Sequence, residues 1–325
     1  MTRSEYKEER NVVVVNKAEE GDFFKEYVNN GVLQASQSAQ ILFEEQGNIE
    51  KVLVANGDYV KKGQLLGRVE DQQQQYNYDR SVRNLEKARL EMATMLIEQG
   101  YKLADSNNIP NEVYERAKVK SGYYDAINDQ ELASIKLAHT RLVAPFNGVI
   151  ADLEAKANNQ TSQYKQFCQL INNAAFEVEF LVLESELEDM EPGMTVEVSP
   201  FAYPEYSCSG EIHTVNPKVE ESGMVKVRAI VKNMDGKLAE GMNVKILVKK
   251  LIGKRVFVPK EAITLRQERD VVFTHRNDTA FWNYVRVGPT NSKYTVIEEG
   301  IRSGDEVVVE GNFNLAHLAV VEVID

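Results

Sequence analysis

The stretch Arg141-Leu142-Val143-Ala144-Pro145-Phe146-Asn147-Gly148-Val149-Ile150 decides the fold. It predicts two short strands joined by a tight turn, because Pro, Asn and Gly are turn residues. Residues 47–66 carry a matching pattern of short apolar segments and glycine turns far upstream. We therefore expect the two stretches to be the halves of one small β-sandwich. The predicted turn positions are Gly57, Gly63, Pro145 and Gly148.

The segment between the two halves has the composition of a helix. Residues 72–104 contain no proline and are rich in Gln, Glu, Arg, Lys, Leu and Met, which favour helix. Residues 105–110 predict a turn, and residues 111–138 a second helix. Two long helices joined by a short loop form an antiparallel hairpin. Each arm would be on the order of 40 Å long.

A heptad pattern, with spacings of four and three residues, predicts a coiled-coil seam on the first helix. Its positions are Tyr78, Val82, Leu85, Arg89, Met92, Leu96, Gln99 and Leu103. The second helix has a thinner apolar stripe, formed by Val113, Ala117, Tyr124, Ile127, Ile135 and Ala138. The pattern alone allows two interpretations: a helical insertion packed on its own protein, or a projecting arm that contacts partners.

The place of this insertion resembles the architecture of the membrane fusion protein family. In a biotinyl or lipoyl carrier domain, the two half-sandwiches meet at a tight hairpin whose lysine bears the cofactor. Here Gln72-Gln73-Gln74-Gln75 follows the first half, without a lysine at a turn apex. Residues 144–150 are similar to the family's A-P-F-D-G-x-I signature, with Asn147 in place of Asp. We therefore expect no cofactor.

Two C-terminal segments extend this resemblance over roughly residues 40–325. Val258-Pro259-Lys260-Glu261-Ala262-Ile263 is similar to the family's V-P-x-x-A-[IV] strand entry. Residues 297–311 resemble its I-x-x-G-L-x-x-G-D-x-V-V-x-x-G segment, with Ile301 where Leu is usual. The similarity is to the subfamily that serves resistance–nodulation–division (RND) pumps.

The resemblance implies a mainly β fold with an inserted α-helical hairpin, in an elongated chain of several domains. An internal repeat, residues 191–198 and 240–246, has a Gly turn, a Met and alternating apolar residues, which suits an antiparallel barrel. We expect these divisions: a membrane-proximal β-domain (11–23 with 251–325), a β-barrel (24–40 with 174–250), a split lipoyl/biotinyl-like β-sandwich (41–71 with 139–173) and an α-helical coiled-coil hairpin (72–138).

The function implied by the resemblance is that of a non-enzymatic periplasmic adaptor in a Gram-negative bacterium. Such an adaptor links an inner-membrane RND transporter to an outer-membrane channel and enables export of drugs or other small molecules. The family implies a hexameric ring of copies. We expect the leader peptide to be missing from this sequence, with any lipid anchor it carried. Two alternatives stay open: an adaptor for an ATP-driven (ABC) exporter, and a biotin or lipoyl carrier domain.

The hairpin tip is the predicted contact with the outer-membrane channel. The subfamily pattern of Arg, then Leu four residues on, then Ser seven further, aligns with Gln99, Leu103 and Pro110, so that only Leu103 is kept. The polar contacts of the tip must therefore differ here. The predicted contact residues are Gln99, Leu103, Ser106, Asn107, Asn108, Ile109 and Pro110.

Composition excludes several other functions. The formal net charge of −12 argues against nucleic acid, and against binding an anionic membrane through charge alone. Two cysteines are too few for a disulfide framework, and no histidine pair has helical metal spacing. No G-x-S-x-G, P-loop or G-x-G-x-x-G motif occurs. The acidic run of residues 184–191 predicts a solvated face or a subunit contact. We therefore expect no catalytic, cofactor or metal site.

Overall fold

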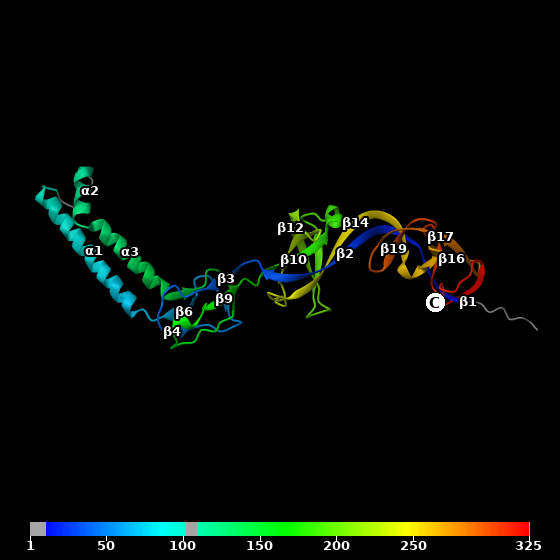
Figure 1. Cartoon of the computed structure of the whole chain (residues 1–325), viewed down its shortest axis with the longest axis horizontal. Helices are drawn as coiled ribbons and strands as arrows, with labels where there is room; N and C mark the ends of the chain where they lie inside the picture. The colour runs from blue at the N-terminus through cyan, green and yellow to red at the C-terminus, as the bar shows by residue number, and fades with distance from the viewer. Residues whose placement is uncertain (1–10, 102–108, 325) are drawn as a thin grey trace, which may run out of the picture. The chain divides into compact units, whose positions relative to one another are not determined.

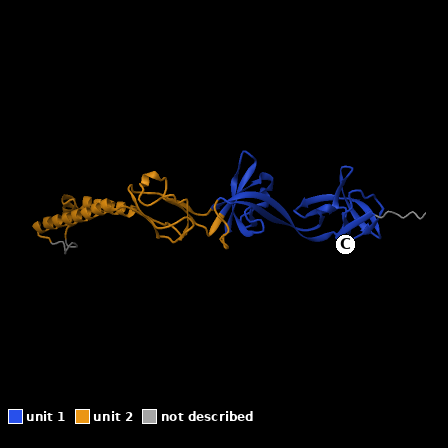
Figure 2. Cartoon of the chain, turned by 90° about the horizontal axis from the view of Figure 1, so that it is seen from below, with its two compact units in different colours: residues 1–34, 177–232, 241–325 blue, residues 35–176, 233–240 orange. Residues whose placement is uncertain are grey.

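The computed structural model describes residues 11–101 and 109–324, and the chain divides into two compact units (Figure 2). Each unit is assembled from segments that are distant in the sequence. The first unit consists of Met1–Gln34, Glu177–Lys232 and Gly241–Asp325, and the second of Ala35–Phe176 and Asn233–Glu240.

Two small sheets form a β-sandwich in the second unit, with strand orders β3-β9-β8-β5 and β4-β6-β7. The strands are β3 (Ser38–Ile41), β4 (Ile49–Val52), β5 (Tyr59–Val60), β6 (Leu65–Val69), β7 (Arg141–Val143), β8 (Gly148–Ala151) and β9 (Cys168–Ile171). The two distant stretches pair directly, Val60 with Gly148 and Leu65 with Val143. Side chains from both stretches share one buried core around Phe167. The predicted split sandwich is therefore confirmed.

The helices are inserted between the paired strands β6 and β7. Helix α1 (Gln72–Glu98) follows β6, α3 (Tyr123–His139) precedes β7, and the shorter α2 (Asn111–Lys120) lies between them (Figure 1). The backbone N–H of Val69 donates to the carbonyl of Thr140 at 2.8 Å. The chain therefore leaves the sandwich and returns to it at one place, and the predicted mainly β fold with an inserted hairpin is confirmed.

The second helical segment is broken, which the sequence analysis did not predict. Gly122 has a φ of +68°, in the left-handed region, and separates α2 from α3. The hydroxyl of Ser121 donates to the carbonyl of Lys118 at 3.1 Å at the end of α2. The expectation of one helix over residues 111–138 is therefore wrong. A single glycine costs a helix only about 1 kcal/mol, so its presence did not require a break.

Six strands centred on the first unit close into a ring. In the order β11-β12-β13-β10-β2-β14 each strand bonds the next, and β11 also pairs with β14. The strands are β2 (Glu19–Ala35), β10 (Ala175–Leu183), β11 (Thr195–Pro200), β12 (Cys208–Val219), β13 (Met224–Lys232) and β14 (Asn243–Pro259). The two sequence repeats lead into β11 and β14, where Val196 lies opposite Val248. The repeat therefore marks two adjacent strands of the predicted antiparallel barrel.

A second, smaller ring follows the order β16-β17-β21-β1-β20 and is closed by the pairing of β16 with β20. Strand β15 pairs with β16 outside this ring, and β18 and β19 extend the larger sheet from β14. The strands are β1 (Asn11–Lys17), β15 (Ile263–Arg266), β16 (Arg269–Arg276), β17 (Thr279–Tyr284), β18 (Arg286–Thr290), β19 (Tyr294–Glu299), β20 (Glu306–Glu310) and β21 (Ala319–Val323). Val13, Val271 and Phe273 contribute to its buried core.

Candidate partner-binding surfaces

Small side chains line the contact between α1 and α3. The buried residues of α1 are Ser81, Ala88, Met92 and Leu96. The predicted seam positions Val82, Arg89 and Gln99 are exposed instead, so the predicted register is wrong at these three positions. Ser81 and Ala88 are small enough to let the helix backbones approach, and the sequence analysis looked for large apolar side chains at the seam.

The outer faces of the hairpin carry large apolar side chains that are open to solvent. On α1, Tyr76, Leu90 and Ile97 are 57%, 60% and 62% exposed. On α3, Leu132 and Ile135 are 52% and 45% exposed. At 3.6 residues per turn, Leu90 and Ile97 lie on the side of α1 opposite the seam. Each helix thus presents an apolar strip that the described chain does not cover.

The charged side chains of the two helices have opposite sign over one stretch of the hairpin. Residues 80–89 of α1 hold four basic side chains and one acidic, whereas residues 123–131 of α3 hold three acidic side chains and none that is basic. Arg80 and Asp129 line one groove between the helices, so the two stretches lie at the same level of the hairpin. The hairpin therefore has a basic stretch on α1 and an acidic stretch on α3 at the same level.

The predicted channel-contact residues fall into three groups. Gln99 and Pro110 are exposed, at the end of α1 and the start of α2. Ile109 is only 7% exposed and packs against Met92 and Leu96 inside the hairpin, so its side chain is not displayed. The other four, Leu103, Ser106, Asn107 and Asn108, lie outside the described residues.

A polar cluster that the sequence analysis missed joins α2 to α3. Lys118 Nζ lies 2.9 Å from Glu115 Oε1, and the hydroxyl of Tyr124 donates to Glu115 Oε2 at 2.5 Å. These two bonds lower the pKa of the Glu115 carboxyl, the bond from Lys118 more than that from Tyr124. The Lys118 ammonium also lies 4.2 Å from the ring centroid of Tyr114. The cluster spans Gly122 and so holds the bend between the two helices.

The four predicted sandwich turns are not alike. Gly57 and Gly63 have φ of +91° and +80°, which only glycine adopts without strain, and open space surrounds the position of a Cβ on each. Pro145 is exposed in the bend before β8. Gly148 is the first residue of β8, and a Cβ there would lie 2.5 Å from the carbonyl oxygen of Ile171. Gly148 is therefore required by the close approach of β9, and its assignment to a turn is corrected.

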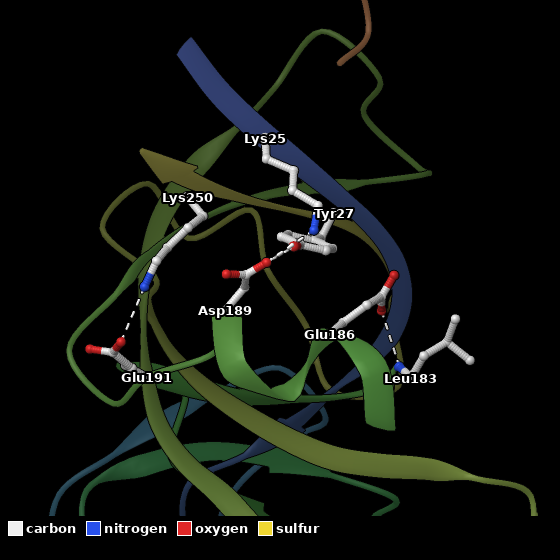
Figure 3. Close-up of polar contacts among 7 residues, drawn as sticks. All are labelled: Lys25, Tyr27, Leu183, Glu186, Asp189, Glu191 and Lys250. Carbon is white, nitrogen blue, oxygen red and sulfur yellow. Dashed lines mark hydrogen bonds and ion pairs between the residues drawn. The ribbon is translucent and has the colours of Figure 1, made fainter. Parts of the chain in front are cut away.

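Two members of the acidic run pair with lysines of the same chain (Figure 3). The Tyr27 hydroxyl and the Lys25 ammonium both donate to Asp189 Oδ2, the latter at 3.0 Å. The bond from Tyr27 is the larger cause that lowers the pKa of the Asp189 carboxyl, followed by the bond from Lys25. Lys250 Nζ lies 3.1 Å from Glu191 Oε1. Part of the acidic run is thus neutralised within the barrel.

The described residues offer little for covalent or metal chemistry. Among residues 11–101 and 109–324, no group of three or more His, Cys, Asp or Glu side chains could hold a metal ion. Burial raises the pKa of the Cys168 thiol to about 11, so this thiol stays protonated at neutral pH. No helix in the part of the chain that the structure describes is long and apolar enough to span a membrane.

Comparison with known proteins gives two domain matches. Residues 178–250 match the model of the CusB-like β-barrel domain, and residues 256–316 match the CzcB C-terminal circularly permuted SH3-like domain. An uncharacterized protein of Haemophilus influenzae is 23% identical over 251 residues, which cover 75% of this chain and 63% of that protein.

Two named relatives and a solved structure extend the comparison. The macrolide export protein MacA of Escherichia coli O157:H7 is 24% identical over 89% of this chain and 86% of its own length. The membrane fusion protein MtrC of Neisseria gonorrhoeae is 24% identical over 86% and 74%. The crystal structure of a MacA–MexA chimera, with the α-hairpin of Pseudomonas aeruginosa MexA, has a TM-score of 0.65 at 19% identity, and covers 90% of this chain and 100% of the chimera. These are proteins of export and membrane fusion, which confirms the prediction that the chain is not an enzyme.

Proposed function

We propose that this chain, which belongs to the membrane fusion protein family, is a periplasmic adaptor that links an inner-membrane RND transporter to an outer-membrane channel for the export of drugs or other small molecules. The observation that carries the proposal is the helical hairpin between β6 and β7. Its helices carry apolar strips that the described chain leaves uncovered, and they hold charged stretches of opposite sign. A hairpin of this kind fits partners rather than the body of its own protein.

Copies of the chain would pack side by side through these faces. The basic stretch of α1 in one copy then meets the acidic stretch of α3 in the next, at the same height, and the apolar strips are buried between them. A contact between two different faces repeats around a closed ring. The family resemblance implies that such a ring would hold six copies.

The division of labour along the chain follows the four domains proposed from the sequence. The membrane-proximal β-domain (residues 11–23 with 251–325) and the β-barrel (24–40 with 174–250) would contact the transporter. The lipoyl-like sandwich (41–71 with 139–173) would form the ring. The hairpin (72–138) would reach the channel, with Gln99 and Pro110 on its exposed surface.

The proposal also names the class of transporter, for which RND pumps and ABC exporters are the two candidates. The short name of the family model that matches residues 178–250 includes RND, which favours a transporter of that class. The names of the sequence relatives state no transporter class. An ABC exporter is therefore the second candidate partner. A biotin or lipoyl carrier role has no support from the strands, since the β6–β7 connection is the helical insertion and not a lysine-bearing turn.

Cross-linking in intact cells tests this proposal. The chain, with a C-terminal tag, is cross-linked in its own organism, purified under denaturing conditions and analysed by mass spectrometry. We expect peptides of an RND transporter and of an outer-membrane channel. Recovery of an ABC transporter would replace the RND assignment, and recovery of neither membrane partner would contradict the adaptor function. A biotin or lipoyl adduct on the chain would instead support the carrier reading.

A further inference from the structure

The β15–β16 turn is a tight turn, forming a tip that displays an apolar side chain. Gln267 and Glu268 have φ of +49° and +62°, so they form a two-residue turn of the type that suits the twist of paired strands. Leu265, next to this turn, is 70% exposed, although Ile263 on the same face of β15 packs into a buried core. Leu265 therefore continues a buried apolar row into solvent.

A second exposed apolar side chain is held beside this tip. Phe313 is 77% exposed. Its carbonyl oxygen accepts a hydrogen bond from Arg266 Nη2, which also donates to the carbonyl of Asn312 at 3.3 Å. The buried side chain of Asn312 donates in turn to the carbonyl of Glu261 at 2.7 Å. The loop is thus fixed, and an aromatic ring that could have folded inward is presented outward.

Two arginines at this tip form no ion pair with a described carboxylate, although Glu268 and Asp270 are their neighbours in sequence. Arg266 and Arg269 lie directly opposite each other across the turn, an arrangement that repulsion between like charges disfavours. Elsewhere in this part of the fold, Arg276 and Arg286 pair with carboxylates, whereas in the described part of the chain Arg266 and Arg269 form no ion pair. Their guanidinium carbons lie 6.0 Å from the Phe313 ring centroid and 5.3 Å from that of Tyr284, respectively.

We propose that this tip, defined by Leu265, Arg266, Arg269 and Phe313, contacts a phospholipid surface. Leu265 and Phe313 would enter the boundary between headgroups and acyl chains, and the exposed Arg269 guanidinium would bind a lipid phosphate, while Arg266 holds the loop of Phe313 in place. Arginine suits this boundary, since its stem lies along apolar surface while its charged head stays among phosphates. Glu268 in the turn and Asp270 beside it balance the charge of the two arginines, so insertion would depend on Leu265 and Phe313 and not on a net positive charge of the tip.

The arrangement favours a membrane over a protein partner. Protein interfaces form on broad, contiguous patches with a buried apolar centre. Here Arg266 reaches toward Phe313, and Leu265, its neighbour along the strand, points to the opposite face of β15. Two separate apolar side chains thus flank one turn, and both can enter a soft lipid surface together. The contact goes beyond the adaptor function proposed above and does not require the transporter.

Flotation with lipid vesicles tests the proposal on the chain alone. Vesicles of phosphatidylethanolamine and phosphatidylglycerol are mixed with the purified protein, and the fraction that floats with them gives an apparent partition coefficient. The double variant Leu265→Ser with Phe313→Ser should lower that coefficient at least about tenfold, because each methylene in lipid contributes a factor of about four. Arg269→Glu should weaken binding to these vesicles more than binding to pure phosphatidylcholine vesicles.

A matched control separates a local contact from general stickiness. Met234 is 87% exposed and lies in the other compact unit, so Met234→Ser should leave flotation unchanged. The fluorescence of Trp282, which packs against Phe273 and Tyr284, shows whether the variants keep their fold. Failure of the natural chain to float, or equal flotation of the double variant, would overturn the proposal. If the natural chain does not float but Phe313→Ser abolishes cross-linking to a transporter, the tip is a protein contact and the lipid proposal is wrong.

Discussion

Replacement of Gly148 by alanine tests whether close packing joins the two half-sandwiches. The added Cβ would lie 2.5 Å from the carbonyl oxygen and 2.9 Å from the carbonyl carbon of Ile171, in the neighbouring strand β9. Contacts below 3.0 Å are essentially never seen for a real Cβ, so β8 and β9 must separate by about half an ångström or more. Overpacking of this kind costs about 2–3 kcal/mol. The glycine signature of the family would then reflect a steric limit between two strands.

Gly63→Ala provides the matched control. Gly63 has a φ of +80°, but nothing lies within 4 Å of the added Cβ. The variant therefore bears only the strain of a left-handed backbone, about 1 kcal/mol. Both glycines belong to the same sandwich, so the comparison separates crowding from backbone strain.

Amide hydrogen exchange read by mass spectrometry measures both effects locally. At 1.4 kcal/mol for each factor of ten, Gly148→Ala should accelerate the exchange of protected β8 and β9 amides about 30- to 150-fold, and Gly63→Ala about fivefold. A peptide that contains Trp282, in the other compact unit, should exchange as in the natural protein. The reasoning fails if Gly148→Ala changes exchange less than twofold, or less than Gly63→Ala does.

Three further predictions concern the hairpin and the barrel. Arg83→Glu should reduce chemical cross-linking between copies several-fold, because it places like charges at the proposed contact. The double variant with Glu131→Arg exchanges the two charges and should restore the cross-linked species. A denaturing gel measures the amount of that species. Ile109→Asp should destabilise the hairpin by about 3 kcal/mol, as read from thermal loss of circular dichroism at 222 nm, since Ile109 is buried. Gln99→Asp, at the exposed C-terminal end of α1, should cost less than about 1 kcal/mol. The pKa of the Asp189 carboxyl is lowered in the folded protein, so its contribution to the free energy of unfolding is present above the ordinary value of 3.8 and is lost as the pH falls below it. Asp189→Asn should remove that pH dependence, at a cost of about 1 kcal/mol near neutral pH. Urea unfolding followed by Trp282 fluorescence measures both effects.

Glycine, proline and turn chemistry made the overall architecture predictable. Positive φ at Gly57 and Gly63 follows from local backbone sterics, and such positions can be recognised without knowledge of distant contacts. The change of composition at Gln72 likewise marked the start of α1 at the observed residue. These features are local, and they fixed the order of strands and helices well.

Features that depend on distant neighbours were not predictable in the same way. The seam runs through Ser81 and Ala88 because α3 approaches closely there, and no periodic count of large side chains finds small residues. The sequence around Gly148 predicts a turn glycine, and its actual role depends on the close approach of β9, which is distant in sequence. The bend at Gly122 is spanned by the bond from Tyr124 to Glu115, which forms only once α2 and α3 meet.

In the candidate site, too, the local features were predictable and the features that depend on distant contacts were not. The sequence placed Gln99 and Pro110 at the surface of the tip but did not show that Ile109 packs inward, which requires the ends of α1 and α2 to meet. The sequence analysis overlooked one signal. Most charged side chains in residues 80–89 are basic, and all charged side chains in residues 123–131 are acidic. Charge patterning along the two predicted helices would have identified these two stretches of opposite sign.

The split sandwich allows the inserted helical hairpin to vary in length and sequence without loss of the β-fold. Closing an unstructured loop over residues 70–140, instead of a short turn, would cost the β6–β7 pairing only on the order of 2–3 kcal/mol. The hairpin lowers even this cost, because antiparallel α1 and α3 bring Val69 and Thr140 back into hydrogen-bond contact. The packing of the sandwich therefore depends on the two ends of the helical hairpin, and not on the hairpin's length, tip or charges. The solved chimera of MacA with the α-hairpin of MexA is an instance of that independence in a protein of similar fold. An exchanged hairpin should therefore leave the exchange of β8 and β9 amides unchanged. Under the adaptor function proposed above, the same exchange should alter which outer-membrane channel is cross-linked to the chain.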